Sequence, residues 1–492
     1  MVSRLCTGPE HARCTRRAWL WRAGGGLGGV ALAWMLARDA AAAGARPAAG
    51  EADPVRPWIP KSTHFPPRAS RVVQIFLTGG VSHVDTWDYK PDLEKFAGQP
   101  LTGKGKIDTF FAQPGTLMPS PFPFRRHGQS GHWVSDLLPY LAGCVDRLTF
   151  FHGMVAKSSN HTPATFQMNS GFPLNGFPCL GSWVTYGLGS ETDDLPAFVV
   201  LPDPRQLPAG GSINWTAGFL PAAYQGVPFR TQGDPLSDLF PAAVQPAPRE
   251  RAVRDLLRQM NEEYLEATPG ESSLAARIRS YELAARMQSS IPDVYRLDTE
   301  TADARRLYGL DDPTCGAFGR NCLVARRLLE RGVRFVQLYH GGAFSAPRIN
   351  WDAHEDVREN HSNQAASMDR PVAGLLKDLE QRGMLEDTLV IWCTEFGRTP
   401  FTQGLGARGR DHHQLCFTTW MAGAGLRPGC SHGESDEVGY QPGRDATSIY
   451  DFHATILHLL GLDHKRLTYY HNGIRRRLTD VHGEVIRSVL AA

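Results

Sequence analysis

The sequence lacks the cysteine patterns that hold many exported or zinc-binding proteins together. It has nine cysteines among 492 residues, and none of them form a C-x-x-C pair. Seven cysteines follow the first 45 residues, and they are spread along the chain: Cys144, Cys179, Cys315, Cys322, Cys393, Cys416 and Cys430. An odd, scattered set is not a disulfide framework. We expect several of these cysteines to be small buried apolar residues. Whether Cys315 and Cys322 form a disulfide in an oxidising compartment is left open by the sequence.

The chain also lacks an excess of charge and, beyond its N-terminus, a long apolar run. The formal net charge is +2 at pH 7, which argues against nucleic acid as a main partner. No stretch after the first 45 residues approaches the ~20 apolar residues of a membrane-spanning helix, so we expect no membrane span in the mature chain. An apolar fraction of 42% and a charged fraction of 21% are typical of a globular protein.

The N-terminal segment has the order of elements that is typical of an export signal. Two adjacent arginines stand before a glycine-rich apolar stretch at 23–36, and the alanines at 40–43 offer a cleavage site. The arginine pair indicates the twin-arginine route, which carries folded proteins. We therefore expect a signal peptide over 1–45, a linker over 46–70, and a periplasmic or secreted mature protein. The alternatives are a general secretory signal and an uncleaved anchor.

Segments typical of strands and helices alternate through residues 71–492. Short apolar runs such as 71–78 and 388–393 predict strands, and apolar residues spaced three and four apart predict helices. This alternation predicts an α/β fold with a mostly parallel central sheet and helices on both faces. Residues 202–310 differ, because a Pro- and Gly-rich stretch is followed by a long helical pattern over 250–289. We expect a loop-rich and helical insertion there.

Polar side chains follow three of the predicted strands. In a parallel sheet the site lies at the carboxyl ends of the strands, so we expect these side chains to meet at one edge. Imidazoles and carboxylates are ligands for a divalent metal such as zinc, manganese or calcium. The candidate ligands are Asp85, Asp352, His354, Glu395, Asp411, His412 and His413. As alternatives, Asp85 suits a helix cap, and Asp352 with His354 suits a solvated loop pair.

The segment after the predicted strand at 148–151 begins a helix. A helix N-terminus favours an anion or a nucleophile, so His161 and Thr162 are candidate catalytic residues. Ser159 or Asn160 capping the helix is the simpler explanation of these residue types.

Several motifs together resemble the family called domain of unknown function 1501. They are LTGGVSHVDTWD at 77–88, WDAH at 351–354, TEFGRTP at 394–400, GRDHH at 409–413 and DFHATILHLLG at 451–461. The resemblance covers nearly all of the mature chain. It implies an exported bacterial protein, often labelled sulfatase-like, whose family is similar to the alkaline phosphatase and sulfatase superfamily. That superfamily has an α/β fold with a metal site at the strand ends.

The sequence departs from that superfamily at positions that carry its chemistry. His161 lies where the sulfatase nucleophile is expected, and no Cys or Ser occupies a C/S-x-P-x-R context, so formylglycine chemistry is not expected. Phe396 replaces a ligand histidine, and Gly79 and Gly80 stand where the first strand usually ends in Asp. The usual two-metal set is therefore not intact.

Two functions remain open from the sequence. The first is a metal-dependent hydrolase of phosphate or sulfate esters, acting on a small-molecule or polysaccharide ester outside the cytoplasm. In this reading His161 or Thr162 is the nucleophile or orients one, and Arg398 holds an anionic substrate group or pairs with a neighbouring acid. The second is a catalytically degenerate, exported binding protein with the same fold. Resemblance of fold does not decide between them, and the hydrolase requires the candidate residues to converge.

Overall fold

The computed structural model describes residues 58–110, 113–230, 232–236, 247–267, 272–343 and 348–491. The signal expected over 1–45 and residues 46–57 of the expected linker lie outside these residues. Among the helices of the described ranges, none is long and apolar enough to cross a membrane.

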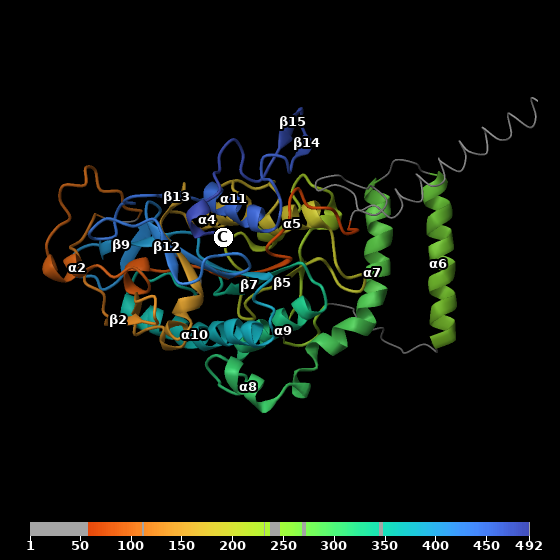
Figure 1. Ribbon diagram of the computed structural model, residues 1–492, viewed down its shortest axis with the longest axis horizontal. Coiled ribbons are helices and arrows are strands. Elements are labelled where there is room, and N and C mark those ends of the chain that lie inside the picture. The colour runs from red at the N-terminus through yellow and green to blue at the C-terminus, as the bar shows by residue number, and fades with distance from the viewer. Residues whose placement is uncertain are drawn as a thin grey trace, which may run out of the picture. The chain divides into compact units, whose positions relative to one another are not determined.

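A nine-stranded sheet forms the centre of the described part of the chain (Figure 1). Its strands run in the order β12 (Cys430–His432), β4 (Leu148–Val155), β11 (Phe417–Gly423), β8 (Thr388–Cys393), β1 (Arg71–Leu77), β7 (Phe335–His340), β5 (Phe198–Leu201) and β6 (Val227–Pro228), while β13 (Thr447–Ser448) pairs with β4. In this described sheet, β11 alone is antiparallel to its neighbours. The other pairs are parallel, which confirms the expected mostly parallel sheet.

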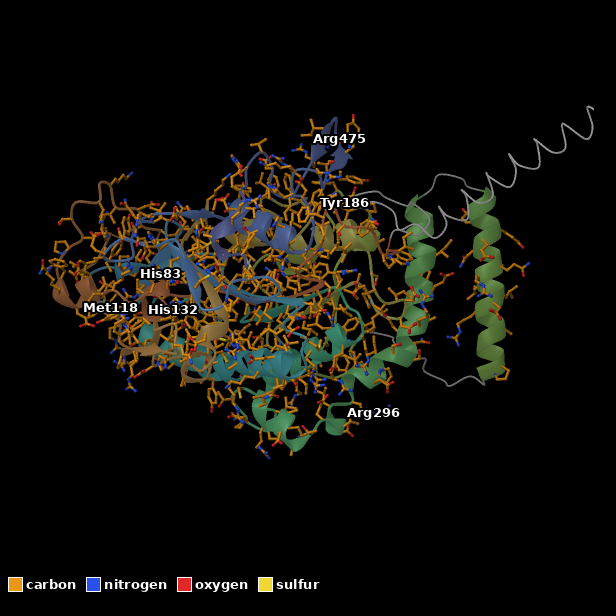
Figure 2. The ribbon with its side chains drawn as sticks, viewed as in Figure 1. His83, Met118, His132, Tyr186, Arg296 and Arg475 are labelled. Carbon is orange, nitrogen blue, oxygen red and sulfur yellow. The ribbon has the colours of Figure 1, made fainter. Side chains whose placement is uncertain are left out.

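Strand β1 shows how the sequence builds a core on each face of the sheet. Alternate side chains of a strand point to opposite faces, so Val73, Ile75 and Leu77 pack in one core and Val72 and Phe76 in the other. The first core includes α7 (Ser272–Tyr295), α8 (Ala302–Tyr308), α9 (Gly316–Glu330) and α10 (Val357–Gln381), and the second includes α4 (His161–Ser170), α5 (Leu180–Leu188) and α11 (Ile449–Leu459). Helices therefore cover both faces, and side chains fill the space against the sheet (Figure 2).

Shorter elements complete the described fold. Two-stranded sheets pair β2 (Phe124–His127) with β3 (His132–Ser135), β9 (Gly397–Thr402) with β10 (Arg410–His413), and β14 (Tyr469–His471) with β15 (Ile474–Arg476). The further helices are α2 (Pro91–Lys95), α3 (Pro139–Ala142) and α6 (Ala247–Ala267), with 3-10 turns at His83–Asp85, Val145–Arg147, Gly211–Trp215, Ala222–Tyr224, Leu297–Thr299 and Arg487–Val489. The β9–β10 hairpin carries several of the candidate site residues.

The segment expected as an insertion, 202–310, adds to the sheet as well as to the helices. Strand β6 extends the sheet beside β5. The single long helical pattern over 250–289 corresponds to two helices, α6 and α7. Pro269 and Gly270 stand between them in the sequence, and neither residue favours a helix.

The expectations for individual elements succeed where apolar runs are strong. The strands expected over 71–78 and 388–393 are β1 and β8. Helix α5 was missed because all of its residues are buried, so it has no polar face to reveal a helical period. The β9–β10 hairpin was missed because its strands are largely polar and include Pro400.

Cys315 and Cys322 do not form the disulfide that the sequence left open. Both thiols are free and buried. Cys315 precedes α9 and Cys322 lies inside it, and seven residues along a helix correspond to ~10 Å. That separation exceeds the reach of a disulfide.

Candidate metal centre

The carboxyl ends of β4, β8 and β7 bring together residues that are far apart in the sequence. His161 begins α4, which follows β4. Glu395 follows β8, and Asp352 lies in the loop after β7. His412 comes from β10. All four side chains are buried, and they meet at the edge of the sheet where a site was expected.

One oxygen, Oδ1 of Asp352, stands at the centre of the cluster. It lies 3.4 Å from His161 Nε2, 2.7 Å from His354 Nε2 and 3.2 Å from His412 Nε2. The Nε2 atoms of His354 and His412 are 2.9 Å apart, and ligand atoms of His161, Asp352 and His412 all lie within 4.8 Å of one another. Ligands ~2 Å from a tetrahedral zinc ion are ~3.4 Å from each other, so this spacing suits a metal ion.

Each of the three imidazoles is held through Nδ1 by an oxygen that only accepts hydrogen bonds. The pairs are His161 with Glu395 Oε1 at 2.7 Å, His412 with the Ser159 carbonyl oxygen at 2.6 Å, and His354 with Gln403 Oε1. Nδ1 must therefore donate in all three rings. A neutral ring that donates from Nδ1 presents a lone pair at Nε2, as metal-ligating histidines do.

Three such lone pairs around one carboxylate oxygen repel one another unless positive charge lies between them. Burial lowers the pKa of His412 to about 2, so this ring carries no second proton near neutral pH. Burial also lowers the pKa of His161, but hydrogen bonds to Asp352 and Glu395 outweigh it and leave that pKa raised. One proton satisfies only part of the cluster. The donor set of three nitrogens and a carboxylate fits a divalent cation.

The glycine after β1 allows a close approach that supports the cluster. Gly79 has a φ of +110°, and a Cβ at this position would lie 2.6 Å from the backbone nitrogens of Trp351 and Asp352. Its own N–H donates to Glu395 Oε1 at 2.8 Å, the oxygen that also holds His161. The end of β1 therefore contributes through its backbone, and not through a side-chain ligand.

Arg398 orients the central carboxylate. It is fully buried, and its Nη2 lies 2.5 Å from Asp352 Oδ1. Each of its three nitrogens donates to a backbone carbonyl oxygen, from the glycine turn after β1 or from β10. From the sequence, the partner of Arg398 was either a substrate anion or a neighbouring acid. In the structure its partner is a neighbouring acid, Asp352.

Arg348 is a second arginine at Asp352, and it differs from Arg398 in its exposure. Its Nη1 contacts Asp352 Oδ2, and its side chain is 27% exposed. It also pairs with Glu355, with 2.9 Å between Nη2 and Oε1. Arg348 is therefore the basic group of the cluster that solvent can reach.

Asp85, expected as a ligand, lies in a separate buried ion pair. Arg410 Nε is 2.7 Å from its Oδ2 and Nη2 is 3.1 Å from its Oδ1, while the Ser82 hydroxyl donates to Oδ2 at 2.5 Å. Burial raises the pKa of Asp85, but Arg410 and its hydrogen bonds outweigh this and leave the pKa lowered. Both carboxylate oxygens are bound by protein groups, which places Asp85 outside the cluster.

Asp411 and His413 flank His412 but contact other groups. Successive side chains of a strand alternate in direction. Asp411 Oδ2 accepts a hydrogen bond from the Phe110 N–H at 2.8 Å. His413 Nε2 lies 2.5 Å from the Tyr440 carbonyl oxygen, and its ring stacks on that tyrosine. Of the three polar residues in this run, His412 is the one that joins the cluster.

Aromatic rings enclose the cluster. Phe396, which replaces the histidine of the resemblance, lies 4.9 Å from the His161 ring and 4.8 Å from the His412 ring between centroids. Phe110 stacks on the other side of His412 at 4.8 Å. His161 and Asp352 are only 4% and 2% exposed. This dry surrounding strengthens electrostatic interactions within the cluster.

Three contributors to the cluster escaped the sequence analysis. Ser159 acts through its backbone carbonyl, which no side-chain pattern reports. Gln403 lies beyond β9 and belongs to no motif of charged residues. Arg348 left one signal, its position four residues before Asp352.

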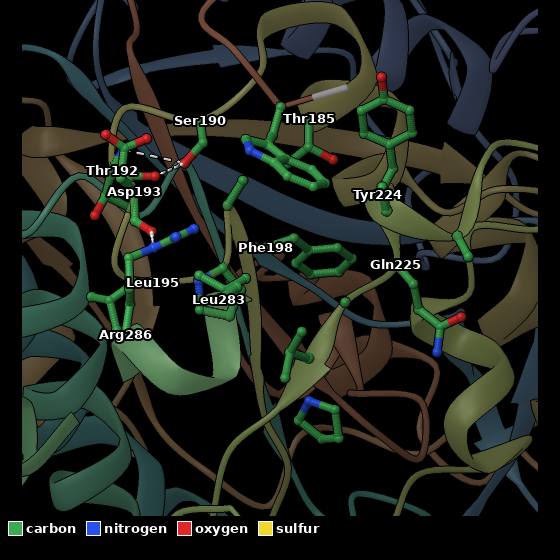
Figure 3. A pocket seen from close by; sticks show the side chains of 18 residues that line it. Thr185, Ser190, Thr192, Asp193, Leu195, Phe198, Tyr224, Gln225, Leu283 and Arg286 are labelled. Atoms are coloured by element: carbon green, nitrogen blue, oxygen red, sulfur yellow. Dashed lines mark hydrogen bonds between the residues drawn. The ribbon is translucent and has the colours of Figure 1, made fainter. Parts of the chain in front are cut away.

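A cavity of about 400 Å³ lies apart from this cluster, beside β5 and β6 (Figure 3). Phe198 and Leu283 contribute to a mainly apolar lining, and none of the cluster's residues lines it. At its rim Arg286 donates to the Asp193 carbonyl oxygen at 2.6 Å. The cavity therefore supplies no ligands to the candidate metal centre.

The fold and the cluster define an α/β protein with a mostly parallel sheet and a candidate metal centre at the carboxyl ends of its strands. The chain belongs to the family of proteins of unknown function DUF1501, whose profile matches residues 69–490. This match confirms the family resemblance of the motifs. No curated protein matches the sequence.

Several solved structures are similar to this one at about one-tenth sequence identity. Ps i-CgsB in complex with k-i-k-neocarrahexaose has a TM-score of 0.36 and 10% identity, over 80% of this chain and 72% of that chain. The lipoteichoic acid synthase LtaP from Listeria monocytogenes has a TM-score of 0.34 and 9% identity, over 84% and 76%. A protein in the alkaline phosphatase superfamily from Vibrio parahaemolyticus has a TM-score of 0.33 and 11% identity, over 81% and 69%.

Proposed function

We propose that this protein is a metal-dependent hydrolase of phosphate or sulfate esters, with its metal at the Asp352 cluster. One observation carries the proposal: three imidazole Nε2 atoms lie within 3.4 Å of Asp352 Oδ1. Because each ring is fixed through Nδ1, its lone pair is directed at the same point. Such a buried set of acceptors is unfavourable alone and favourable around a cation.

The donor set favours zinc or manganese over calcium. Imidazole nitrogens from His161, His354 and His412 suit zinc and similar ions, whereas calcium takes six to eight oxygen ligands. Glu395 holds His161 in the manner of a carboxylate that supports a metal-bound histidine.

The chain's own residues divide the remaining tasks of ester hydrolysis. A bound divalent cation would polarise an oxygen of the phosphate or sulfate group. Arg348 is placed beside Asp352 to bind an anionic oxygen of that group. Thr162, in the first turn of α4, supplies the nucleophilic hydroxyl, and His161 serves as a ligand. Arg398 acts as a positioning residue for Asp352.

The test of the metal centre compares two adjacent histidines of β10. His412→Gln removes a ligand, and we expect it to lose both bound metal and turnover of aryl phosphate and aryl sulfate esters. His413→Gln alters the ring bonded to the Tyr440 carbonyl, and we expect it to keep both. Equal metal loss in the two variants would overturn the proposed ligand set. Wild-type protein that stays without metal after loading with zinc or manganese would do the same.

The nucleophile is tested separately, with a conservative pair of variants. Thr162→Val removes the hydroxyl at nearly constant shape, so we expect full metal content and no turnover. Thr162→Ser keeps a hydroxyl, so part of the turnover should remain. Turnover at the wild-type rate in Thr162→Val would exclude this residue as the nucleophile.

Burial of the cluster favours a second candidate function, a catalytically degenerate binding protein. Phe110 stacks on His412, and the central carboxylate is nearly fully buried. In this alternative the metal stabilises the fold and nothing is hydrolysed. Full metal content without turnover on any ester of the panel, in wild-type protein, supports this reading over the hydrolase.

Export through the twin-arginine route is part of the proposal. A route that carries folded protein suits a centre assembled from residues as distant as His161 and His412, because the metal can be loaded before export. Replacing Arg16 and Arg17 by lysine keeps the charge, and we expect the variant to stay in the cytoplasm. If cell fractionation shows that the lysine variant is exported as well as the wild type, the assignment to the twin-arginine route is contradicted.

A further inference from the structure

Helix α6 carries a row of large apolar side chains that the rest of the described chain leaves exposed. Val253, Leu256, Leu257, Met260 and Tyr264 are exposed by 50%, 58%, 52%, 56% and 57%. Helix α7 follows α6 in the chain and is its neighbour in Figure 1, but these residues remain exposed. Most of the stability of a helix in a protein comes from packing of its apolar face, so an uncovered face of this size calls for a partner.

The five apolar residues form one narrow stripe. At 100° per residue they fall within roughly 100° of the helix circumference, which is the width of a face that packs on another element. Leu256 and Leu257 lie at the two edges of the stripe, about one turn after Val253. Its two ends, Val253 and Tyr264, are 11 positions apart in the sequence. We call this surface the α6 stripe.

Charge is distributed unevenly along the same helix. Exposed arginines Arg249 and Arg254 lie in its N-terminal half, Arg258 lies next to its midpoint, and exposed acids Glu262 and Glu263 lie in its C-terminal half. Asp255 pairs with Arg258 within the helix, at 2.8 Å. Arg249 lies in line with the α6 stripe about one turn before Val253, and Glu263 lies beside the stripe on nearly the same side of the helix, because 14 residues are almost four full turns.

We propose that two copies of this chain associate through the α6 stripe, with the two helices antiparallel. A two-fold axis at Leu256 and Leu257 places the N-terminal half of one α6 beside the C-terminal half of the other. Arg249 of one copy then lies beside Glu263 of the second copy, and the reverse pair forms at the other end. Val253, Leu256, Leu257 and Met260 are covered by their counterparts, each Tyr264 lies beside the first turn of the second helix, and the charges at both ends are complementary.

The charge pattern argues against the other occupants of such a stripe. A parallel pair would set Arg249 against Arg249 and Glu263 against Glu263, which is unfavourable at both ends. An anionic membrane surface attracts arginines but repels Glu262 and Glu263, and helices that bind such surfaces carry mainly basic polar faces. The antiparallel pair is the arrangement that uses both halves of the helix.

The first experiment measures the oligomeric state of the full mature chain by sedimentation equilibrium. We expect a concentration-dependent dimer for the wild type and a monomer for Leu257→Glu, which puts a charge at the proposed two-fold axis. The matched control is Leu405→Glu, because Leu405 is 86% exposed and lies outside α6. A monomeric wild type, or equal dissociation by the two variants, overturns the proposal.

A charge exchange tests the antiparallel direction. Arg249→Glu and Glu263→Arg each set two like-charge pairs in the dimer, and each should weaken dimerisation on the order of tenfold at low salt. The double variant restores opposite charges and should recover wild-type affinity. If both single variants dimerise weakly and the double variant does too, the pairing of Arg249 with Glu263 is excluded. If the wild-type chain is a monomer that binds anionic vesicles through the α6 stripe, the dimer proposal is overturned and a membrane surface is the partner of the stripe.

Cysteine cross-linking gives the same direction independently. Leu256→Cys lies beside its own counterpart in the antiparallel pair and should cross-link on oxidation. Val253→Cys alone should not, because its counterpart lies ~10 Å away along the axis, whereas a mixture of Val253→Cys and Met260→Cys should. Cross-linking of Val253→Cys with itself would indicate a parallel pair and overturn the proposal. Wild-type protein controls for the native thiols.

Discussion

Asp85 and Asp352 are two buried carboxylates, and each binds an arginine from the same hairpin. Arg398 of β9 binds Asp352, and Arg410 of β10 binds Asp85. Asp85 receives two guanidinium nitrogens and a serine hydroxyl. Asp352 is met in addition by three imidazoles at one oxygen. Each carboxylate has its own arginine as charge partner, and the two sites differ in the other groups that surround the carboxylate.

This difference separates a structural ion pair from a candidate ligand site. A carboxylate matched by two nitrogens of one arginine is satisfied within the protein. At Asp352 three imidazole nitrogens lie close to the carboxylate oxygen, and nitrogens and a carboxylate together are a donor set that a divalent cation binds. Residue types do not make the distinction, since a histidine lies at both sites: His361 Nε2 accepts a hydrogen bond from the Ser82 N–H at 3.1 Å.

The largest effect is expected when the Asp352 charge is removed. Asp352→Asn keeps the shape but weakens the ligand, so bound metal should fall to background. Turnover should drop on the order of a thousandfold, because a catalytic metal contributes several kcal/mol. Elemental analysis and ester assays measure the two quantities. Asp85→Asn is the matched control, and equal metal loss in its folded fraction would remove the contrast between the sites.

The control variant Asp85→Asn should lower the free energy of unfolding, although it leaves the bound metal unchanged. Asp85→Asn leaves the Arg410 guanidinium buried without its partner charge, which costs about 3–5 kcal/mol. Urea unfolding followed by circular dichroism measures this loss. A loss below about 1 kcal/mol, the value of an exposed pair, would show that the Asp85–Arg410 ion pair does not stabilise the fold as a buried pair.

A smaller effect is expected from the support of the ligand. Glu395→Gln keeps an oxygen near His161 Nδ1 but removes the negative charge, so metal affinity should fall about 10–100-fold. Competition with a chelator measures the affinity. Turnover at saturating metal should return towards the wild-type value, and turnover that stays low with metal bound would assign Glu395 a direct part in the reaction.

The smallest effect is expected from a change of one pH unit, which alters metal binding. The pKa of His161 is raised, so a proton competes with the metal below that pKa. The affinity should fall about tenfold per pH unit as the pH drops through this range. The pKa of His412, lowered to about 2 by burial, adds no dependence near neutral pH. Affinity that is constant between pH 5 and pH 8, values that bracket the ordinary pKa of histidine, would exclude His161 as a ligand.

The predictions from sequence succeeded where a local pattern carries the physics. Strand β8 was found at its predicted residues because an apolar run of this kind is buried on both faces of a parallel sheet. Asp352, His354 and His412 were selected because polar residues after such strands meet at one edge. Gln403 and Ser159 were not found, because neither belongs to a pattern: one is a neutral side chain outside the strand, and the other acts through its backbone.

The sequence by itself determined the α/β alternation, the family motifs and a set of residues that contains the ligands of the candidate centre. Only the tertiary structure decided which members of that set converge. In β10 His412 turns towards Asp352 while His413 turns to the Tyr440 carbonyl, and a shift of one residue in register would exchange them. The choice of partner depends on distances between segments that are 27 and 60 residues apart in these two cases, and short-range patterns in a sequence do not record those distances.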